Sequence, residues 1–391
     1  MKKSILSSLK ILDLSRILAG PYCTQILSDQ GAEVTKIESP DGDETRRWGP
    51  PFHKGESAYF SGMNRNKKSV VLNLSEKNSK KVLHKLLSRS DVFVENFKSG
   101  DLKKFGLSDK IIRLKYPRLI HCQISGYGSL GGFKDFPGYD AAIQAWSGLM
   151  SVNGTDRPTK VGVPIVDIVT GQNAAFAIMA ALYERTFSGK GQKIETSLLE
   201  NAFSILHPQT SNYFFSKKNP KRLGNTHPNI APYDLFQTKT LGIYIACGND
   251  RQFHMLCKVL GYEGPTKEFA TNELRVRNRK LLEKKIAPLI LKENAKTLAM
   301  KLLKSGVPAG PALELKDALH SPQVKALKIV KRVGRKSFVM PPYQFSRSKN
   351  TTPKTAPKLG AQTRKVLGEL GLTAEAMKNI LSQQKDGGKN K

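Results

Sequence analysis

ILDLSRILAGPYCTQILSDQGAEVTKIE, residues 11–38, is the segment from which the architecture of the chain can be inferred most directly. Residues 11–15 are short and mostly apolar, as in a buried strand, and Ala19-Gly20-Pro21 predicts a tight turn. Residues 22–30 are typical of a helix that ends at Gly31, and residues 32–38 alternate as a second strand. The segment therefore predicts a β-α-β unit, but one without the GxGxxG fingerprint of a dinucleotide site.

The same alternation continues along the chain. Further strands are predicted at residues 69–74, 91–97, 118–128 and 192–197, with helices at 75–88 and 102–115. Strands that alternate with helices predict an α/β fold with a Rossmann-like parallel sheet that carries helices on both faces. Ligands of such sheets bind at the carboxyl ends of the strands, so we expect a site in the loops after Ser15, Leu74, Phe97 and Ser125.

One carboxylate, Asp167, interrupts the apolar run VPIVDIV at residues 163–169. The block that follows, residues 173–185, is mainly apolar and predicts a helix buried on most of its surface. Asp167 is then expected just ahead of the helix N-terminus, where free N–H groups and the helix dipole favour an ionised carboxylate. From spacing alone, a simple capping role and a functional role both fit this residue.

The second half of the chain predicts a smaller domain. Residues 1–205 form the large domain, 206–224 a loop-rich linker, and 225–325 a smaller α+β domain that begins with a hairpin over residues 233–249. Residues 306–312, GVPAGPA, predict another short unit, and residues 327–333 a further strand. Residues 326–391 form a Pro- and Lys-rich return followed by two short helices.

The formal net charge of the 391-residue chain is +32, which raises the question of a polyanionic partner. Clustered lysine and arginine would fit nucleic acid, but here they are spread over the chain without a winged-helix, RRM or zinc-finger pattern. A generally basic surface and the attraction of a small phosphorylated molecule are the two favoured explanations. We therefore expect no nucleic-acid partner.

The composition of the chain also indicates in which compartment the protein is expected and whether it is expected to bind a metal. No apolar run reaches the roughly 18 residues that cross a bilayer, and Lys10 and Asp13 interrupt the weakly signal-like start. Four scattered cysteines form no CxxC pair, and Cys247, His254 and Cys257 lack a zinc-site spacing. We expect a cytoplasmic protein without a membrane span, a disulfide framework or a metal.

Nine motifs occur in order along nearly the whole chain: residues 11–40, NRNKKSVVLNL at 64–74, VENF at 94–97, ISGYG at 124–128, GYDAAIQAWSGLM at 138–150, PIVDIVTG at 164–171, GNTHPNIAPYDLF at 224–236, GVPAGP at 306–311 and LGELGL at 367–372. Taken together, these motifs resemble the class III coenzyme A-transferases (the CaiB/BaiF family). The resemblance implies a large domain built from both chain ends, a smaller domain between them, and an interlocked homodimer. It also implies that Asp167 is the nucleophile, that coenzyme A and acyl-CoA are substrates, and that no cofactor is permanently bound.

Coenzyme A contacts carry over from the family position by position. Those at the thiol end are Leu18 and Ala19; those along the channel are Ser39, Leu72, Asn73, Leu74, Ser75, Asn96, Phe97, Lys98 and Lys104, continued by Phe136, Pro137, Gly138 and Tyr139. Asp140 is expected beside the nucleophile. Each of these residues also has a purely structural explanation, such as a turn, a core position or a solvated charge.

Several positions at which this chain differs from one branch of the family narrow the choice of substrate. The formyl-CoA:oxalate branch has Gln at the position of Leu18, Arg at Ser39 and Lys104, and a tetraglycine loop where this chain has THPNIAPY. The expected reaction is therefore CoA transfer from an acyl-CoA, preferably succinyl-CoA, to a small carboxylic acid such as a dicarboxylate.

Two alternatives remain. A 2-methylacyl-CoA racemase of the same fold needs two acid/base groups, but Tyr139 stands where that branch has His and is a poor base near neutral pH. A non-catalytic basic protein that binds CoA or nucleic acid would have no use for an intact Asp167.

Overall fold

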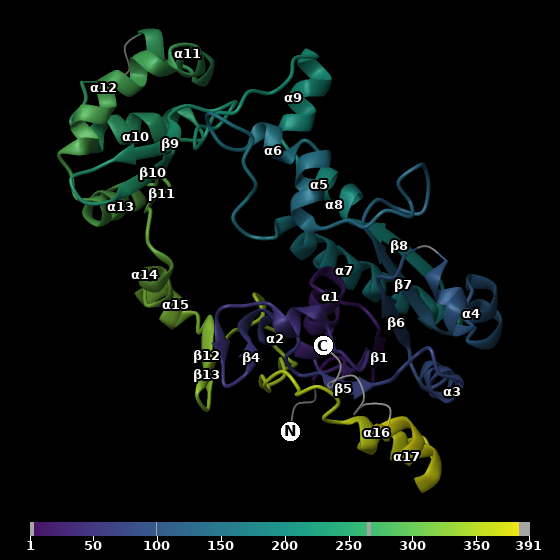
Figure 1. Cartoon of the computed structure of the whole chain (residues 1–391). Coiled ribbons are helices and arrows are strands. Elements are labelled where there is room, and N and C mark those ends of the chain that lie inside the picture. Colours follow the sequence, from purple (N-terminus) through teal and green to yellow (C-terminus); the bar gives the residue numbers. More distant parts are fainter. Residues whose placement is uncertain (1–3, 99, 264–266, 383–391) are drawn as a thin grey trace. The chain divides into compact units, whose positions relative to one another are not determined.

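The computed structural model describes residues 4–98, 100–263 and 267–382, which divide into two compact units (Figure 1). The larger unit comprises Met1–Leu149, Lys160–Phe214 and Ile329–Lys391, and the smaller one Met150–Thr159 and Phe215–Lys328. These boundaries differ from the predicted ones at 205, 224 and 325. The ten residues 150–159 belong with the smaller unit although they lie within the sequence of the predicted large domain.

A six-stranded parallel sheet organises the larger unit and confirms the predicted α/β class. Its strands, in spatial order, are β5 (Lys68–Val71), β2 (Glu33–Glu38), β1 (Lys10–Asp13), β6 (Val92–Glu95), β7 (Ile120–Ser125) and β8 (Lys193–Ser197). The order reverses between β1 and β6, which are neighbours in the sheet although two other strands of the same sheet, β2 and β5, lie between them in the sequence. Such a switch point opens a crevice at the carboxyl ends of the strands.

Side chains alternate between two cores, one on each face of the sheet. Ile11 packs on one face with α1 (Ala19–Asp29) and α7 (Ile165–Ser188), whereas Leu12 packs on the other with α3 (Lys77–Leu87) and α4 (Asp109–Lys115). Because the sheet is covered on both faces, side chains on both sides of its central strands are buried and mostly apolar.

The C-terminal segment returns to this unit (Figure 1). Val366 and Leu367 of α16 (Thr363–Glu369) and Ile380 of α17 (Ala374–Ser382) join the core that contains α3. Both ends of the chain thus contribute to one hydrophobic core.

Shorter elements lie between and after these strands in the sequence, and two of them, α6 for the most part and α9 at its end, belong to the smaller unit. These shorter elements are η1 (Glu44–Arg47), β3 (Phe52–His53), β4 (Glu56–Ser57), α2 (Ala58–Met63), η2 (Asp101–Phe105), α5 (Asp140–Trp146), α6 (Leu149–Val152), α8 (Leu198–Ser204), α9 (Gln209–Ser216), β12 (Val330–Val333) and β13 (Lys336–Val339).

The smaller unit has its own sheet and core. Antiparallel strands β9 (Tyr233–Gln237) and β10 (Gly242–Ala246) form the predicted hairpin, and β11 (Ala309–Pro311), from GVPAGPA, adds a third strand. The helices are α10 (Asp250–Leu260), η3 (Lys267–Phe269), α11 (Asn272–Arg277), α12 (Arg279–Leu291), α13 (Ala295–Lys304), α14 (Leu315–Leu319) and α15 (Pro322–Ala326). Its core lies between the sheet and α10, α12 and α13.

Three local predictions were wrong. The tight turn at residues 19–21 is the first turn of α1, where Pro21 needs no N–H partner. The single helix predicted at 102–115 is broken, because Gly106 takes a left-handed φ of 75° and the Ser108 hydroxyl caps a new helix. The predicted linker contains a helix, α9.

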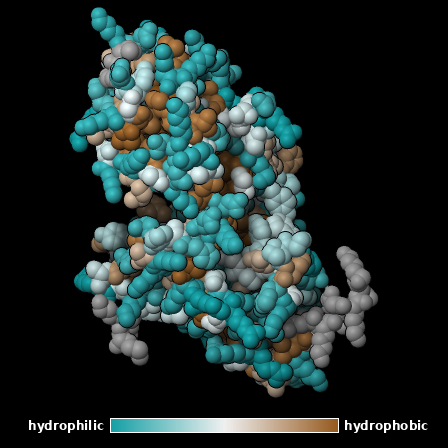
Figure 2. Space-filling view, turned by 90° about the vertical axis from the view of Figure 1, so that its left-hand side faces the viewer, coloured by the Kyte–Doolittle hydropathy of each residue, from teal (hydrophilic) through white to brown (hydrophobic). Residues whose placement is uncertain are grey.

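Helix α7 also departs from the prediction in length and burial. Its 24 residues are long and apolar enough to cross a membrane, which the apolar runs in the sequence did not indicate, although core helices of soluble proteins pass the same test. Only half of its most apolar window is buried within the chain. Three large side chains of α7, those of Phe176, Tyr183 and Phe187, are exposed. Hydrophilic side chains cover most of the face seen in Figure 2, with apolar patches between them.

Candidate active site

Asp167 lies in the first turn of α7, two residues inside the helix rather than ahead of it as predicted. Its side chain is nearly covered, with 8% of the residue exposed. Burial raises the pKa of the Asp167 carboxyl to about 7, the negative charge of Asp140 adds to this rise, and a hydrogen bond from the Ala19 N–H opposes it. The carboxylate is therefore available at neutral pH but poorly solvated.

Asp140 explains why α7 begins where it does. Its Oδ2 accepts hydrogen bonds from the N–H groups of Val166 at 2.8 Å and Asp167 at 3.1 Å, so it caps the helix from outside the local sequence. Its Oδ1 accepts from the Gln144 side chain at 2.5 Å. The structure thus places Asp140 beside Asp167, as expected, and reveals that the contact runs through the backbone.

Helix α1 packs against α7 near the Asp167 carboxylate. The backbone of Ala19, the first residue of α1, opposes the rise in the pKa of this carboxyl. Gly171 lets the two helices approach this closely, because a Cβ there would lie 2.6 Å from the Ala19 carbonyl oxygen. The first turns of two helices, α1 and α7, therefore lie close to the same carboxylate.

Asp167 opens into a cavity of about 520 Å³ at the carboxyl ends of β1, β6, β7 and β8. Nine further residues that the sequence analysis assigned to coenzyme A line this cavity: Leu18, Ala19, Asn96, Phe97, Lys98, Phe136, Pro137, Gly138 and Tyr139. They come from three separate segments, residues 18–19, 96–98 and 136–139, that the fold brings together. The cavity lies at the strand ends, where the sequence analysis expected a site.

A second cavity of about 330 Å³ adjoins the first and shares Arg16, Phe97 and Asp101 with it. Five more of the assigned residues line this one: Ser39, Leu72, Asn73, Leu74 and Lys104. Ser75 lines neither cavity, and its N–H and hydroxyl instead donate to the Asn73 side chain at 3.2 and 2.6 Å. Ser75 therefore shapes a turn rather than a cavity wall.

Tyr59 of α2 was not found by sequence reasoning. Burial, Asp167 and Asp140 together raise the pKa of its phenol to about 12, so it stays protonated at neutral pH and can donate a hydrogen bond. Arg16 was also missed; it lines both cavities and pairs with Glu44 at 3.0 Å. No local pattern marks Tyr59, which approaches the site only through the tertiary fold. Arg16, in contrast, directly follows Ser15, where a site was expected, and that position could have indicated it.

An enclosed carboxylate with an elevated pKa and a backbone donor, beside an elongated pair of cavities, can act as a nucleophile toward a bound acyl group. Comparison with known proteins agrees with this class of site. The family model for CoA-transferase family III matches residues 6–363. The chain therefore belongs to CoA-transferase family III, the CaiB/BaiF family, and is a CoA-transferase.

Individual relatives cover almost the whole chain. It is 38% identical to the succinate–glutarate CoA-transferase of Agrobacterium fabrum, over 94% of this chain and 96% of that one. It is 40% identical to the succinyl-CoA:glutarate CoA-transferase of Mus musculus, over 93% and 86% of the two chains. The crystal structure of a CaiB/BaiF family protein from Brucella suis superposes with a TM-score of 0.85 at 38% identity and covers 95% of this chain and 100% of that one.

Proposed function

We propose that this CoA-transferase moves coenzyme A from succinyl-CoA to a dicarboxylic acid, with Asp167 as the covalent nucleophile. The observation that carries the proposal is the buried Asp167 carboxylate, which has a raised pKa and opens into the cavity at the strand ends. The choice of succinyl-CoA and a dicarboxylate rests on the relatives, which are succinate–glutarate and succinyl-CoA:glutarate CoA-transferases.

The proposed reaction consists of four balanced acyl transfers. The Asp167 carboxylate attacks the thioester carbonyl of succinyl-CoA, which breaks the C–S bond and leaves a succinyl-aspartyl anhydride and CoA thiolate. The thiolate attacks the aspartyl carbonyl, which releases succinate and leaves an aspartyl-CoA thioester. The acceptor carboxylate attacks that thioester to give a second anhydride and thiolate, and the thiolate then takes the acceptor acyl group and frees Asp167.

The site geometry suits the charge changes of this sequence. Burial makes the ionised Asp167 less stable, and therefore more reactive, than a solvated carboxylate. The Ala19 N–H can bond the aspartyl oxygen throughout, and a protonated Tyr59 lies near it. Each step exchanges one activated acyl group for another, so no metal or nucleotide hydrolysis is required.

The two adjoining cavities are the proposed coenzyme A site. Lys98 and Lys134 line the larger cavity and Lys104 the smaller one, where their charges can attract phosphate groups. Phe97 and Phe105 contribute aromatic walls, with ring centroids 5.3 Å apart. The pantetheine would then run along the larger cavity toward Asp167, with the nucleotide toward the smaller one.

A homodimer is part of the proposal. Phe176, Tyr183 and Phe187 of α7 are 68–75% exposed, and Phe215 of α9 is 94% exposed. Large apolar side chains gathered on one helix are typical of protein–protein contacts. Light scattering during gel filtration should give twice the 43.3 kDa chain mass, and a monomer at micromolar concentration would contradict this part.

We also place the enzyme in the cytoplasm, a proposal that fractionation of source cells would test.

The function is tested by incubating the protein with succinyl-CoA and a panel of dicarboxylates, followed by chromatography of the CoA esters. Transfer to a dicarboxylate is expected for the wild type and for Asp317→Asn, an exposed control carboxylate on α14. Asp167→Asn, which keeps the shape of the side chain, should be inactive. Deuterium incorporation at the α-carbon of a 2-methylacyl-CoA without any CoA transfer would instead favour a racemase.

A further inference from the structure

Two ion pairs within the chain lie where the two cavities of the candidate active site meet. Arg16 and Asp101 line both cavities. Arg16 Nη1 lies 3.0 Å from Glu44 Oε1, and Lys104 Nζ lies 2.6 Å from Asp101 Oδ1. The side chains of Arg16 and Glu44 are 51% and 39% exposed, so a ligand can reach this pair. A phosphorylated ligand that spans both cavities therefore passes a guanidinium group that already has an acidic partner.

The backbone that carries Arg16 is held in place from two sides. The Asn96 side chain accepts from the Arg16 N–H at 2.9 Å and donates to the Arg16 carbonyl oxygen at 2.9 Å. The Ser15 carbonyl oxygen accepts from Lys36 Nζ at 2.6 Å. Ile17 has a φ of 72°, in the left-handed region that β-branched side chains avoid, and such strain persists only where the surroundings enforce it. The part of Arg16 that remains free to change partner is its side chain.

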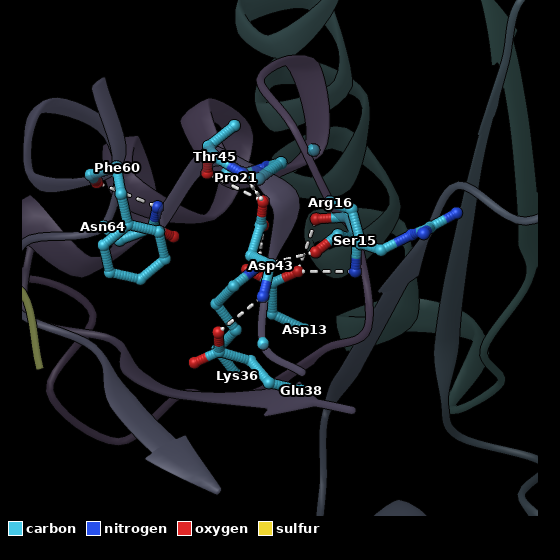
Figure 3. A network of polar contacts seen from close by, with 12 residues as sticks. Asp13, Ser15, Arg16, Pro21, Lys36, Glu38, Asp43, Thr45, Phe60 and Asn64 are labelled. Carbon is cyan, nitrogen blue, oxygen red and sulfur yellow. Dashed lines mark hydrogen bonds and ion pairs between the residues drawn. The ribbon is translucent and has the colours of Figure 1, made fainter. Parts of the chain in front are cut away.

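The same buried lysine also holds the backbone that carries Glu44. Lys36 Nζ pairs with Asp43 Oδ2 at 2.9 Å, and Asp43 Oδ1 accepts from the N–H and the hydroxyl of Thr45 at 3.0 and 2.7 Å. Lys36 thus binds the residue before Arg16 and the residue before Glu44. Figure 3 shows Arg16 at the edge of this buried network, with its side chain extending outside it. The fold therefore presets the separation of the two partners.

An exposed pair of this kind is easily opened by a stronger anion. It contributes little by itself, because water solvates both charges well. A diphosphate carries two negative charges and offers arginine parallel, charge-assisted hydrogen bonds, so it can displace a single carboxylate. In a CoA ester the diphosphate lies between the pantetheine and the nucleotide, the two parts that the proposed function puts in different cavities. Arg16 lies at the boundary between those cavities.

We propose that Arg16 binds the diphosphate of the CoA ester and that it leaves Glu44 to do so. The proposal rests on the proposed function in that the two cavities are taken as the coenzyme A site. Glu44 holds the guanidinium at the junction while the site is empty and competes with the diphosphate for it. Glu44 therefore lowers the affinity for CoA esters and speeds their release. A transferase needs such release because its product carries the same CoA group as its substrate.

The two single substitutions should change CoA affinity in opposite directions, as measured by calorimetry on the full chain. Arg16→Met should weaken binding about tenfold. Glu44→Gln removes the competing charge and should strengthen binding about two- to fivefold. A pair that only stabilised the junction would make both substitutions act in the same direction. Weaker or unchanged binding by Glu44→Gln would therefore overturn the proposal, whether or not Arg16→Met folds.

The double variant separates partner exchange from direct repulsion of the ligand by Glu44. Arg16→Met/Glu44→Gln should bind CoA as Arg16→Met does, because Glu44 acts only through Arg16. Tighter binding by the double variant than by Arg16→Met would overturn the exchange. Arg47→Met is the matched control, since Arg47 is exposed on the same loop as Glu44 and donates to the Asp41 carbonyl oxygen at 3.2 Å. It should bind CoA like the wild type, and a loss equal to that of Arg16→Met would show a general effect of charge instead.

Dephospho-CoA identifies the phosphate group that Arg16 binds, because it lacks the phosphate on the ribose but keeps the diphosphate. Arg16→Met should weaken the binding of CoA and of dephospho-CoA by the same factor. A loss confined to CoA would place Arg16 at the ribose phosphate and contradict the proposal. Failure of the proposed function would show differently, as a wild type that binds neither compound or that transfers no CoA.

Discussion

Replacing Asp167 by asparagine should make the folded protein more stable at alkaline pH while it abolishes CoA transfer. The reason is that the fold encloses a carboxyl group that must ionise in order to react. Burial and Asp140 raise the pKa of this carboxyl from 3.8 to about 7. Asparagine keeps an oxygen for the Ala19 N–H but carries no charge into the buried site.

The sign of the pH dependence follows from the direction of the shift. Because the folded-state pKa is raised, folding favours the protonated carboxyl, and this contribution is fully present below the unfolded-state pKa and lost as the pH rises to about 7. A shift of about three units corresponds to roughly 4 kcal/mol of unfolding free energy at about 1.4 kcal/mol per unit. Asp167→Asn should therefore gain on the order of 4 kcal/mol over the wild type above about pH 8, and little below about pH 4.

Urea unfolding of both proteins across this pH range, at one fixed protein concentration, measures the difference directly. Asp317→Asn, a change at an exposed carboxylate, serves as the control and should show no comparable pH dependence. A stability difference for Asp167→Asn that is the same at pH 5 and pH 8.5, or that favours the wild type at high pH, would refute the assigned burial and pKa.

Three further substitutions test other parts of the structure. Gly171→Ala forces a Cβ against the Ala19 carbonyl oxygen, so we expect a loss of about 1–3 kcal/mol in unfolding free energy and reduced kcat; unchanged values in urea and turnover assays would contradict the close helix approach. Asp140→Asn removes a charge that raises the pKa of Asp167, so the acid limb of the kcat–pH profile should move to lower pH, and an upward shift would be inconsistent with the site electrostatics. Arg275→Met, in the smaller unit, removes a fully buried guanidinium that pairs with a carboxylate and bonds backbone carbonyls; a cost of about 3–5 kcal/mol is expected in urea unfolding, whereas a neutral effect would show that these bonds do not stabilise the unit.

The strand–helix alternation of the larger unit could be predicted because it depends on the local spacing of apolar residues along the sequence. Residues 11–15 and 32–38 carry apolar side chains at strand spacing, and the observed β1 and β2 fall within one residue or two of those ranges. The carboxyl-end location of the site followed from the parallel arrangement. Asp167 stood out because a lone carboxylate in an apolar run is costly unless it is used or paired.

What could not be predicted depends on contacts between distant segments. Helix α7 begins at Ile165 because Asp140, more than twenty residues earlier, caps it. Tyr59 has no motif of its own and comes near enough to Asp167 to be affected by its charge only through the tertiary fold. The strain at Ile17 is likewise invisible in the sequence, since nothing local forbids that residue an ordinary backbone conformation.

The central claim, that Asp167 carries the acyl group covalently, is tested most directly by trapping. The protein is incubated with succinyl-CoA, quenched with hydroxylamine or borohydride, and its peptides are analysed by mass spectrometry, with Asp167→Ala alongside. A hydroxamate or reduced side chain at Asp167 in the wild type, and nowhere in the variant, is the predicted result. A modified residue other than Asp167, or CoA transfer that continues in the variant, would contradict the account.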